Sequence, residues 1–288
     1  MTRAWLALAA ACGAPAPARP ASPGAALSLA ADAHMLAIPA GKFVAGSTPE
    51  EREAAYRDLA ASSNIDTALQ RRWFDAEEDR HMTYLPAFRI DLMPVTQAQY
   101  AEFVAAGQAP PPAIDAAGWA AQGEPEDYAT VERYVWRDGR PPAGREEHPV
   151  VLVSYREAAR YCAWRGEQRG APRRLPTAAE YEKAARGDGG VAYPWGNEFE
   201  ADKLDSAVAG PHDTAPVGSY VAGASPYGAL DMAGNVLEWT STPYRAGEMT
   251  VKGSAWTDFA GVGRGASRHG RAIDSRHLAV GFRCAADR

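Results

Sequence analysis

The sequence of 288 residues predicts a single α+β domain with a large share of irregular loops. It contains 27 Gly, 22 Pro and 8 Trp, a mixture typical of bent backbone packed around large aromatic side chains. Signals for helix starts occur in the first two thirds of the chain, whereas short strands between Gly, Pro and Asp turns fill the remainder. Because the sequence also has no internal repeat, we expect one mixed domain and not a helical bundle.

The overall composition is that of a globular protein. Hydrophobic residues make up 46% and charged residues 23%, which is ample for a core and excludes a mainly disordered chain or a coiled coil. The 30 Lys and Arg are outnumbered by 36 Asp and Glu, so the formal net charge is −6. Since nucleic-acid-binding domains usually have a basic surplus, we expect no nucleic-acid partner.

The first twelve residues resemble a bacterial export signal, with Arg3 before a short apolar run. Small residues before Cys12 also resemble a lipoprotein cleavage box, in which Cys12 is lipidated; the alternative is an Ala-rich leader or a misassigned start. Residues 13–33 predict an Ala/Pro-rich linker, and 34–288 the folded domain. We expect a periplasmic or lipid-anchored protein that contacts the membrane only through such an anchor.

The folded part begins with a strand, a turn and a second strand over 36–47, because apolar residues flank Pro39 and Gly41. Residues 49–82 are strongly charged and predict an excursion with helical character. Residues 88–91 alternate apolar and charged side chains as a strand does.

Three capping boxes predict helices that begin after Thr96, Ser154 and Thr177. In each, the hydroxyl and the Gln or Glu three residues later satisfy backbone N–H groups that the first turn leaves unpaired. The first helix is expected to end near Gly107 and the third at Gly187. After Gly187 the apolar residues do not follow a helical spacing, so we expect short strands there.

Two cysteines follow Cys12, namely Cys162 and Cys284. They can form one disulfide in an oxidising compartment, or stay as two buried thiols, and their number alone does not separate these alternatives.

Several strings together resemble the formylglycine-generating enzyme, or sulfatase-modifying factor, family. They lie at 36–47 (LAIPAGKFVAGS), 90–104 (IDLMPVTQAQYAEFV), 148–164 (HPVVLVSYREAARYCAW), 174–187 (RLPTAAEYEKAARG), 193–197 (YPWGN), 214–219 (TAPVGS), 226–240 (PYGALDMAGNVLEWT), 252–254 (KGS) and 281–284 (GFRC). The resemblance implies a loop-rich variant of the C-type-lectin fold. It also implies that Cys162 and Cys284 are the structural disulfide of the family.

The resemblance implies a copper(I) site that is built from two cysteines shortly after the matched Gly-Ser. The corresponding segment, 255–263, contains no cysteine; Thr257 stands at the first position and 260–262 cover the second. We therefore expect no copper site of this type and no formylglycine generation. The iron-binding branch of the family has a His-x3-His-x2-Glu motif, which is missing here; His269 and His277 could form a two-histidine site or be solvated loop residues.

An exported branch of the family also lacks the paired cysteines, and this sequence is similar to it in general type. That branch includes a periplasmic protein needed for oxidative maturation of a pyoverdine siderophore chromophore.

The resemblance further implies a calcium loop at 231–238. Its ligands would be the Asp231 and Glu238 carboxylates with the Gly234 and Val236 carbonyls, hard oxygen donors that suit calcium. The alternative is a tight turn held by Asx hydrogen bonds. A second calcium loop of the family matches poorly, because Ser206-Ala207 replaces an Asn-led pair.

A pocket near the former active site could be lined by arginine, tryptophan and histidine, a combination that suits planar or anionic ligands. The candidate residues are Trp239, Trp256, Arg264, Arg268, His269, Arg271 and Arg283. The alternative is that these arginines pair with the acidic surplus and hold the loop in place.

Two functions follow as hypotheses. The first is an exported, oxidoreductase-like maturation factor acting on a small molecule or peptide. The second is a non-catalytic binding or assembly scaffold with a protein partner in the cell envelope, because fold does not fix function.

Overall fold

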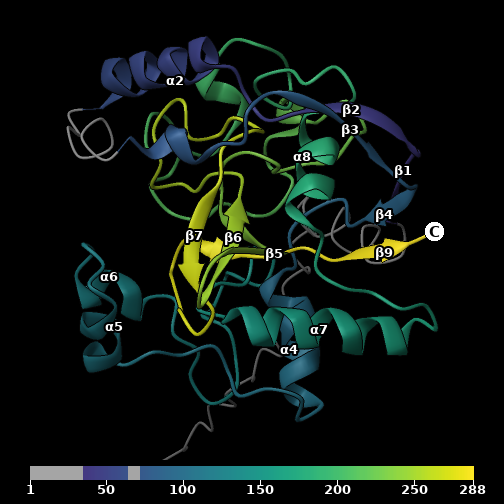
Figure 1. Cartoon of the computed structure of the whole chain (residues 1–288). Helices are drawn as coiled ribbons and strands as arrows, with labels where there is room; N and C mark the ends of the chain where they lie inside the picture. The colour runs from purple at the N-terminus through teal and green to yellow at the C-terminus, as the bar shows by residue number, and fades with distance from the viewer. Residues whose placement is uncertain (1–34, 64–71) are drawn as a thin grey trace, which may run out of the picture.

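The computed structural model describes residues 35–63 and 72–288. The predicted export signal, Cys12 and the linker 13–33 lie outside these residues. The described chain folds into three small sheets with helices packed around them (Figure 1). The predicted single α+β domain with many loops is confirmed.

The first sheet joins the two ends of the described chain. Strand β4 (Phe88–Ile90) lies between β1 (Leu36–Ile38) and β9 (Ala285–Asp287), antiparallel to both. Ile38 faces Phe88, and Ile90 faces Ala285 across the sheet. The N-terminal string of the sequence and its last residues therefore form one structural unit.

The other two sheets lie above and beside the first. Strand β2 (Gly41–Ala45) pairs with β3 (His81–Leu85). The third sheet, at the centre of Figure 1, has the order β7-β6-β5-β8, with β8 parallel to β5. Its strands are β5 (Leu237–Arg245), β6 (Glu248–Lys252), β7 (His269–Ala272) and β8 (Val280–Gly281).

The three predicted capping boxes are present. Thr96, Ser154 and Thr177 cap α4 (Gln97–Ala105), α7 (Tyr155–Gln168) and α8 (Ala178–Arg186). The charged excursion contains α2 (Pro49–Ser62), which has a capping box at Thr48, and the 3-10 helix η1 (Trp73–Ala76).

Two short helices were not expected from the sequence. They are α5 (Ala116–Gln122) and α6 (Tyr128–Glu132), capped by Asp115 and Asp127 without a reciprocal Glu or Gln. Two 3-10 turns, η2 (Ala201–Lys203) and η3 (Val221–Gly223), interrupt the later loops.

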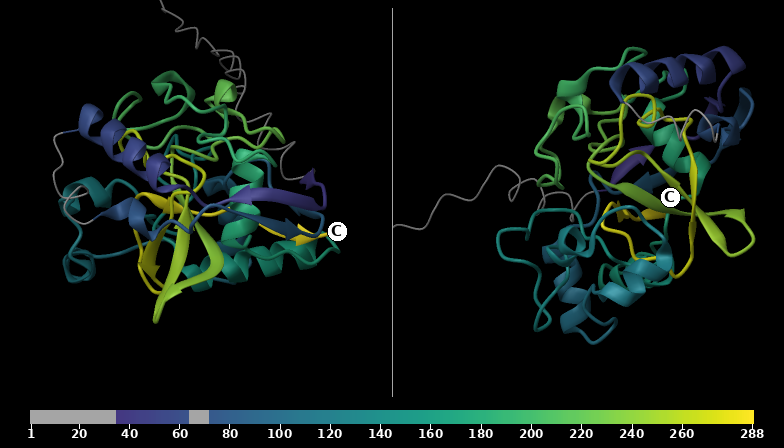
Figure 2. Two further views of the ribbon diagram at one scale, coloured as in Figure 1. Left: turned by 45° about the horizontal axis from the view of Figure 1, so that its top comes forward. Right: turned by 90° about the vertical axis from the view of Figure 1, so that its left-hand side faces the viewer.

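The main core lies between the central sheet and helices α4 and α7 (Figure 2). Tyr100, Phe103, Tyr161 and Phe282 form a connected group of rings there, with centroids 5.3 to 6.2 Å apart. A smaller core packs α8 against β1 and β4, and a third packs α2 against η1 and Val262. Among the described residues, no helix is long and apolar enough to cross a bilayer.

Candidate functional site

The loop that follows β6 forms the centre of the candidate site. Gly253 starts it with φ of 81°, and a Cβ atom there would lie 2.7 Å from the Tyr181 hydroxyl. The chain then makes a tight turn at 255–258. The Asp258 amide donates to the Ala255 carbonyl at 2.9 Å, and the Ala255 amide donates to Asp258 Oδ2 at 2.8 Å. Asp258 is thus held in one place by the backbone.

Helix α2 covers the second half of this loop. The Ala260 amide donates to Ser62 Oγ at 3.2 Å. Gly261 has φ of 89°, and a Cβ atom added there would lie 2.6 Å from the Ala55 carbonyl oxygen. A side chain at 261 would therefore separate α2 from the loop. Helix α2 thus holds this part of the loop 253–268 in place.

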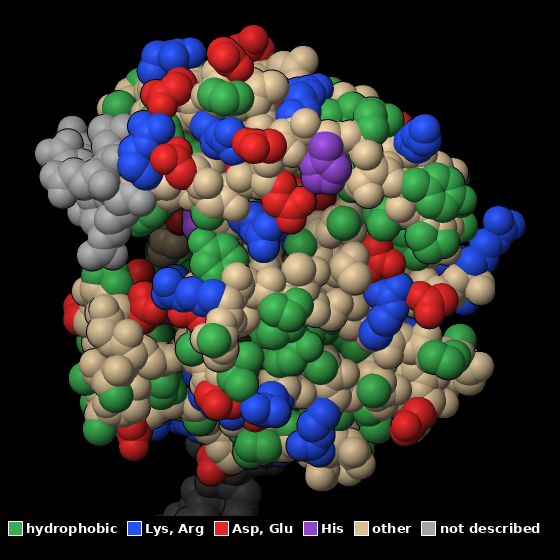
Figure 3. Space-filling view, in the orientation of Figure 1, with side chains coloured by type: hydrophobic (Ala, Val, Ile, Leu, Met, Phe, Trp, Pro, Cys, Tyr) green, Lys and Arg blue, Asp and Glu red, His purple; other side chains and the backbone are tan. Residues whose placement is uncertain are grey.

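Five charged or titratable side chains from four separate segments meet beside the turn. We call them the Asp258 cluster: Glu124, Glu126, Asp258, Arg271 and His277. Arg271 on β7 donates to Glu124, and His277 Nε2 lies 3.5 Å from the same carboxylate. The charge of Arg271 lowers the pKa of Asp258, and the charge of Glu126 raises it. In the orientation of Figure 1, the molecule is hollowed at the level of β7, between α2 above and α5–α6 below (Figure 3).

The Asp258 cluster has perturbed acidities, which are common where chemistry or binding occurs. Burial raises the pKa of Asp258 to about 6, and the Glu126 charge adds to the effect, although the Ala255 amide and Arg271 oppose it. Burial would also raise the pKa of Glu124, but His277 and Arg271 together hold it below its usual value. Burial thus brings the pKa of Asp258 closer to neutral pH than is usual for an aspartate.

Glu124, Glu126 and His277 could hold a metal ion by distance alone, since one ligand atom of each lies within 4.8 Å of the others. The hydrogen bonds of His277 oppose this interpretation. Its Nδ1 accepts the Ala279 amide at 3.1 Å, so in the neutral ring Nε2 carries the proton and donates toward Glu124. We therefore assign His277 to positioning Glu124.

Two polar atoms near the turn have no hydrogen-bond partner among the described residues. They are Glu126 Oε2 and Trp256 Nε1, both buried. Buried polar atoms are almost always paired in native proteins, so a water or a ligand is the expected partner of each.

The predicted pocket of arginines is not assembled as one site. Arg264 pairs with Glu77 at 3.0 Å, Arg268 with Glu78 at 2.7 Å, and Arg271 with Glu124. Each arginine thus ties the loop or β7 to a distant carboxylate, which is the structural alternative expected for these residues.

The other predicted pocket residues have separate structural partners. Trp239 is fully buried and donates to the Val153 carbonyl at 3.1 Å. His269 Nε2 lies 3.2 Å from Ser267 Oγ, and its ring meets Trp73 edge-on. Neither His269 nor Trp239 belongs to the Asp258 cluster. Arg271 and Trp256 are the two predicted pocket residues that lie at or beside it.

The predicted calcium loop is organised by an arginine. Arg283 donates to both carboxylate oxygens of Glu238 at 2.8 Å, and Tyr181 donates to one of them at 3.2 Å. Arg283 and Glu238 are both fully buried. Arg283 thus already neutralises Glu238, so no calcium ion is needed to balance the charge of this carboxylate. Asp231 Oδ2 accepts the Gly218 amide at 2.7 Å.

Asp205 supplies a carboxylate that the sequence reasoning missed. It is 1% exposed, and neither carboxylate oxygen has a hydrogen-bond partner among the described residues. Burial and the charges of Asp231 and Asp213 raise its pKa to about 7. Its carbonyl accepts the Asn235 amide, which places it against the predicted calcium loop. Asp205 stands directly before the poorly matched Ser206-Ala207 pair of the second calcium loop, and this position in the sequence could have pointed to it.

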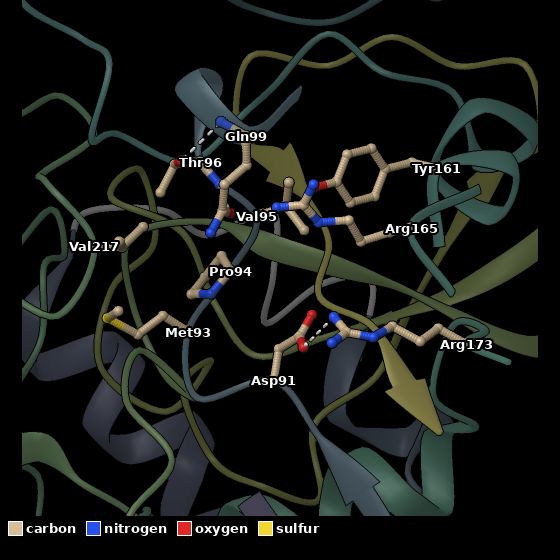
Figure 4. A pocket seen from close by; sticks show the side chains of 10 residues that line it. All are labelled: Asp91, Met93, Pro94, Val95, Thr96, Gln99, Tyr161, Arg165, Arg173 and Val217. Atoms are coloured by element: carbon tan, nitrogen blue, oxygen red, sulfur yellow. Dashed lines mark hydrogen bonds and ion pairs between the residues drawn. The ribbon is translucent and has the colours of Figure 1, made fainter. Parts of the chain in front are cut away.

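The structure contains the disulfide between Cys162 on α7 and Cys284, with an S–S distance of 2.04 Å. Beside it, Asp91 Oδ2 accepts the Cys284 amide at 2.9 Å, and Asp91 Oδ1 lies 3.4 Å from Arg173. A cavity of about 10 Å³ lies in front of Asp91, with Tyr161 and Arg165 on its far side (Figure 4). It has room for about one water molecule, so we assign it no larger ligand.

A larger cavity, of about 390 Å³, lies between α2 and η1. Its arginines are paired with its carboxylates: Arg52 with Asp79 at 2.8 Å, and Arg72 with Glu53 at 2.8 Å and Asp75 at 3.0 Å. The lining charges therefore satisfy one another.

Comparisons with known proteins agree with this architecture. Residues 25–288 match the sulfatase-modifying factor enzyme 1-like domain. The chain is 35% identical over 246 residues to the inactive C-alpha-formylglycine-generating enzyme 2 of Bos taurus, covering 72% of this chain and 79% of the relative. It is 36% identical over 193 residues to a hercynine oxygenase of Mycolicibacterium smegmatis, covering 63% of this chain and 43% of that protein.

Among solved structures, PvdO from Pseudomonas aeruginosa superimposes with a TM-score of 0.65 at 22% identity, covering 88% of this chain and 94% of PvdO. At that identity the likeness shows the fold alone. The match of the family over almost the whole described chain, together with the relatives above 30% identity, shows that this protein belongs to the sulfatase-modifying factor family.

Proposed function

We propose that this protein is an exported maturation factor with oxidoreductase-like chemistry, acting on a small molecule or peptide, and that it does not generate formylglycine. The observation that carries the proposal is the Asp258 cluster. It brings a carboxyl group with a pKa of about 6 to the loop where the family resemblance would place a thiol pair. The similarity to an oxygenase supports an oxidative reaction.

A balanced reaction of this class removes two electrons and two protons from the ligand and transfers them to dioxygen, which becomes hydrogen peroxide. Asp258 would take one of these protons, because its pKa lies near the working pH. Arg271 and His277 would position the cluster through Glu124 and are not themselves proposed as proton carriers.

We also propose a structural calcium ion at the 231–238 loop, held by Asp231 and Asp205 instead of Glu238. A dication would neutralise two buried carboxylates whose pKa values burial raises to about 6 and about 7. Calcium would serve the fold in this proposal, and no reaction step passes through it.

The test compares a strain lacking the gene with strains that carry the wild-type protein, Asp258→Asn or Asp138→Asn. The side-chain amide oxygen introduced by Asp258→Asn can still accept the Ala255 N–H, so the turn is kept while the exchangeable proton is lost. Asp138 is exposed and has φ of 51°, which Asn tolerates, so it is a matched control. Small molecules and peptides of each strain are compared by mass spectrometry.

We expect the deletion strain and the Asp258→Asn strain to accumulate a precursor that is heavier by two hydrogen atoms than a product of the wild-type and Asp138→Asn strains. Identical profiles of the deletion and wild-type strains would contradict the proposal. Full rescue by Asp258→Asn would favour the second candidate, a non-catalytic envelope scaffold. The structural pairing of Arg264 and Arg268 is the observation that favours this alternative.

A further inference from the structure

Strand β3 presents an unpaired edge. It pairs with β2 from Gly41↔Leu85 to Ala45↔His81, and these two strands make up the whole sheet. Among the described residues, no backbone group of 81–85 takes part in any other backbone hydrogen bond. The sheet lies at the upper right rim of the molecule (Figure 1). A row of unpaired N–H and C=O groups of this kind is a template for another strand.

The edge also lacks the usual protections against pairing. The segment His81-Met82-Thr83-Tyr84-Leu85 contains no Lys, Asp, Glu or Pro, and its pairing with β2 has no bulge. Met82 is 58% exposed and Tyr84 is 61% exposed, and both side chains lie on one face of the strand. Hydrophobic side chains gather in the same region of the surface in Figure 3.

We propose that β3 is a dimer interface that pairs antiparallel with β3 of a second copy of this chain, about a two-fold axis at Thr83. In this register Met82 faces Tyr84 of the other copy and His81 faces Leu85. Beyond the strand the ladder stops at Pro86, because β9 occupies the adjoining edge of β4, where Asp287 pairs with Phe88. Within the paired residues 81–85 no like charges meet. The segment is thus complementary to itself, as a two-fold interface requires, which favours a second copy over an unrelated strand.

The interface is small. A five-residue strand with two large apolar side chains covers less than the roughly 1,200 Å² of a standard stable interface, so the dimer should form only at raised concentration. Pro86 limits its extension, because it has no N–H to donate to a longer ladder.

The first experiment is sedimentation velocity of the full chain over a rising concentration series. Wild-type protein should shift from monomer to dimer, whereas Met82→Lys/Tyr84→Lys should stay monomeric over the same range. Val221→Lys is the control, since Val221 is equally exposed at 61% but lies away from β3. Melting curves establish that each variant is folded.

The second experiment uses a cysteine on the proposed axis, in a Cys12→Ser background. Facing Cβ atoms in an antiparallel pair lie about 4.5–5.5 Å apart, within reach of a disulfide after small adjustment. Thr83→Cys should cross-link into a dimer under mild oxidation, and exposed Ser219→Cys should not. A wild-type protein that stays monomeric at the highest concentration, or equal cross-linking of the two variants, would overturn the proposal.

Discussion

Arg283 is the residue that most clearly organises the centre of the molecule. Its guanidinium binds both oxygens of Glu238 and also donates to the carbonyls of Leu230 and Asp231 at 2.8 and 3.1 Å. Because the pair is fully buried, each charge depends on the other for solvation. The loop at 231–238 is therefore ordered by a cation of the protein itself.

The Arg283–Glu238 pair gives the first prediction. Glu238→Gln should lower the free energy of unfolding by about 3–5 kcal/mol, since it leaves a buried guanidinium without its counter-charge. Glu132→Gln is the matched control, because Glu132 pairs with Arg137 on the surface and such pairs contribute about 1 kcal/mol or less. Urea unfolding of the two variants measures this, and equal losses would contradict the buried-pair account.

His269 gives a prediction of pH dependence. Burial, Arg271 and Lys252 lower its pKa to about 4 from the ordinary histidine value of 6.5. Between these values the unfolded chain binds a proton that the native protein does not, so the ring lowers stability as pH falls below 6.5.

Replacing His269 removes this effect. The variant His269→Gln should therefore gain stability relative to wild type by up to about 2 kcal/mol between pH 7 and pH 5. Thermal unfolding at both pH values measures the difference. A difference that stays constant over this range would show that the ring binds its proton at the same pH in the native and the unfolded protein, so that its pKa is not lowered.

Single residues also show the limits of sequence reasoning. Gly, Ser and Thr at helix ends could be predicted, because capping depends on neighbours three residues away. The partners of Arg264 and Arg268 could not, since Glu77 and Glu78 lie almost 190 positions earlier in the chain. The sequence alone therefore does not separate a pocket role from a structural role for these arginines.

At the scale of elements, the disulfide fastens α7 to the last strand segment. The two cysteines are 122 residues apart, and the chain-entropy model gives about 4–5 kcal/mol for closing a loop of this length. Cys162→Ala/Cys284→Ala should lower the unfolding free energy by about that amount, as measured with urea. A loss below about 1 kcal/mol would show that the reduced unfolded chain is already compact.

The calcium proposal belongs to the loop formed by 204–206 and 231–238. Added calcium should raise the melting temperature of chelator-treated protein, because a ligand that binds only the native state stabilises it. Asp205→Asn should abolish this rise, and Asp202→Asn, on η2, should retain it. If calcium leaves the wild-type melting curve unchanged, the loop is a metal-free turn held by Arg283.

The elements that build the Asp258 cluster were only partly predictable. Strands and helices with strong periodic or capping signals were expected at the right places, including α4, α7 and α8. The α5–α6 pair was missed because each helix spans at most seven residues and has no capping box. The connector between these two helices carries Glu124 and Glu126. Most of the acidic residues of the Asp258 cluster therefore lie where no capping or periodic pattern marks the sequence.

At the scale of the whole molecule, the fold was predictable and the site was not. Many separate strings along the chain match the family in the same order, so several segments independently predict the fold. The site depends on one turn, one strand and two connectors that are distant in the chain and close in space. Contacts between distant loops produce no periodic pattern in the sequence. The disulfide Cys162–Cys284 joins α7 to the residue before β9, and its two cysteines were visible in the sequence without proving their pairing.

We propose that the loop at 253–268 carries a carboxyl-centred site where the family resemblance would place a thiol pair. Of three cysteines in the chain, Cys162 and Cys284 form the disulfide, and 255–263 contains none. Thr257 cannot replace a thiolate, because a hydroxyl is a poor ligand for copper(I) and does not exchange with a substrate thiol.

The most direct measurement incubates the purified protein and copper with a Cys-x-Pro-x-Arg peptide, beside an active formylglycine-generating enzyme as positive control. Peptide mass is followed for conversion of cysteine to the aldehyde. We predict no conversion above the blank, with or without copper, by a protein whose melting curve shows that it is folded. Copper-dependent conversion would contradict the account and place a thiol-based active site elsewhere in the chain.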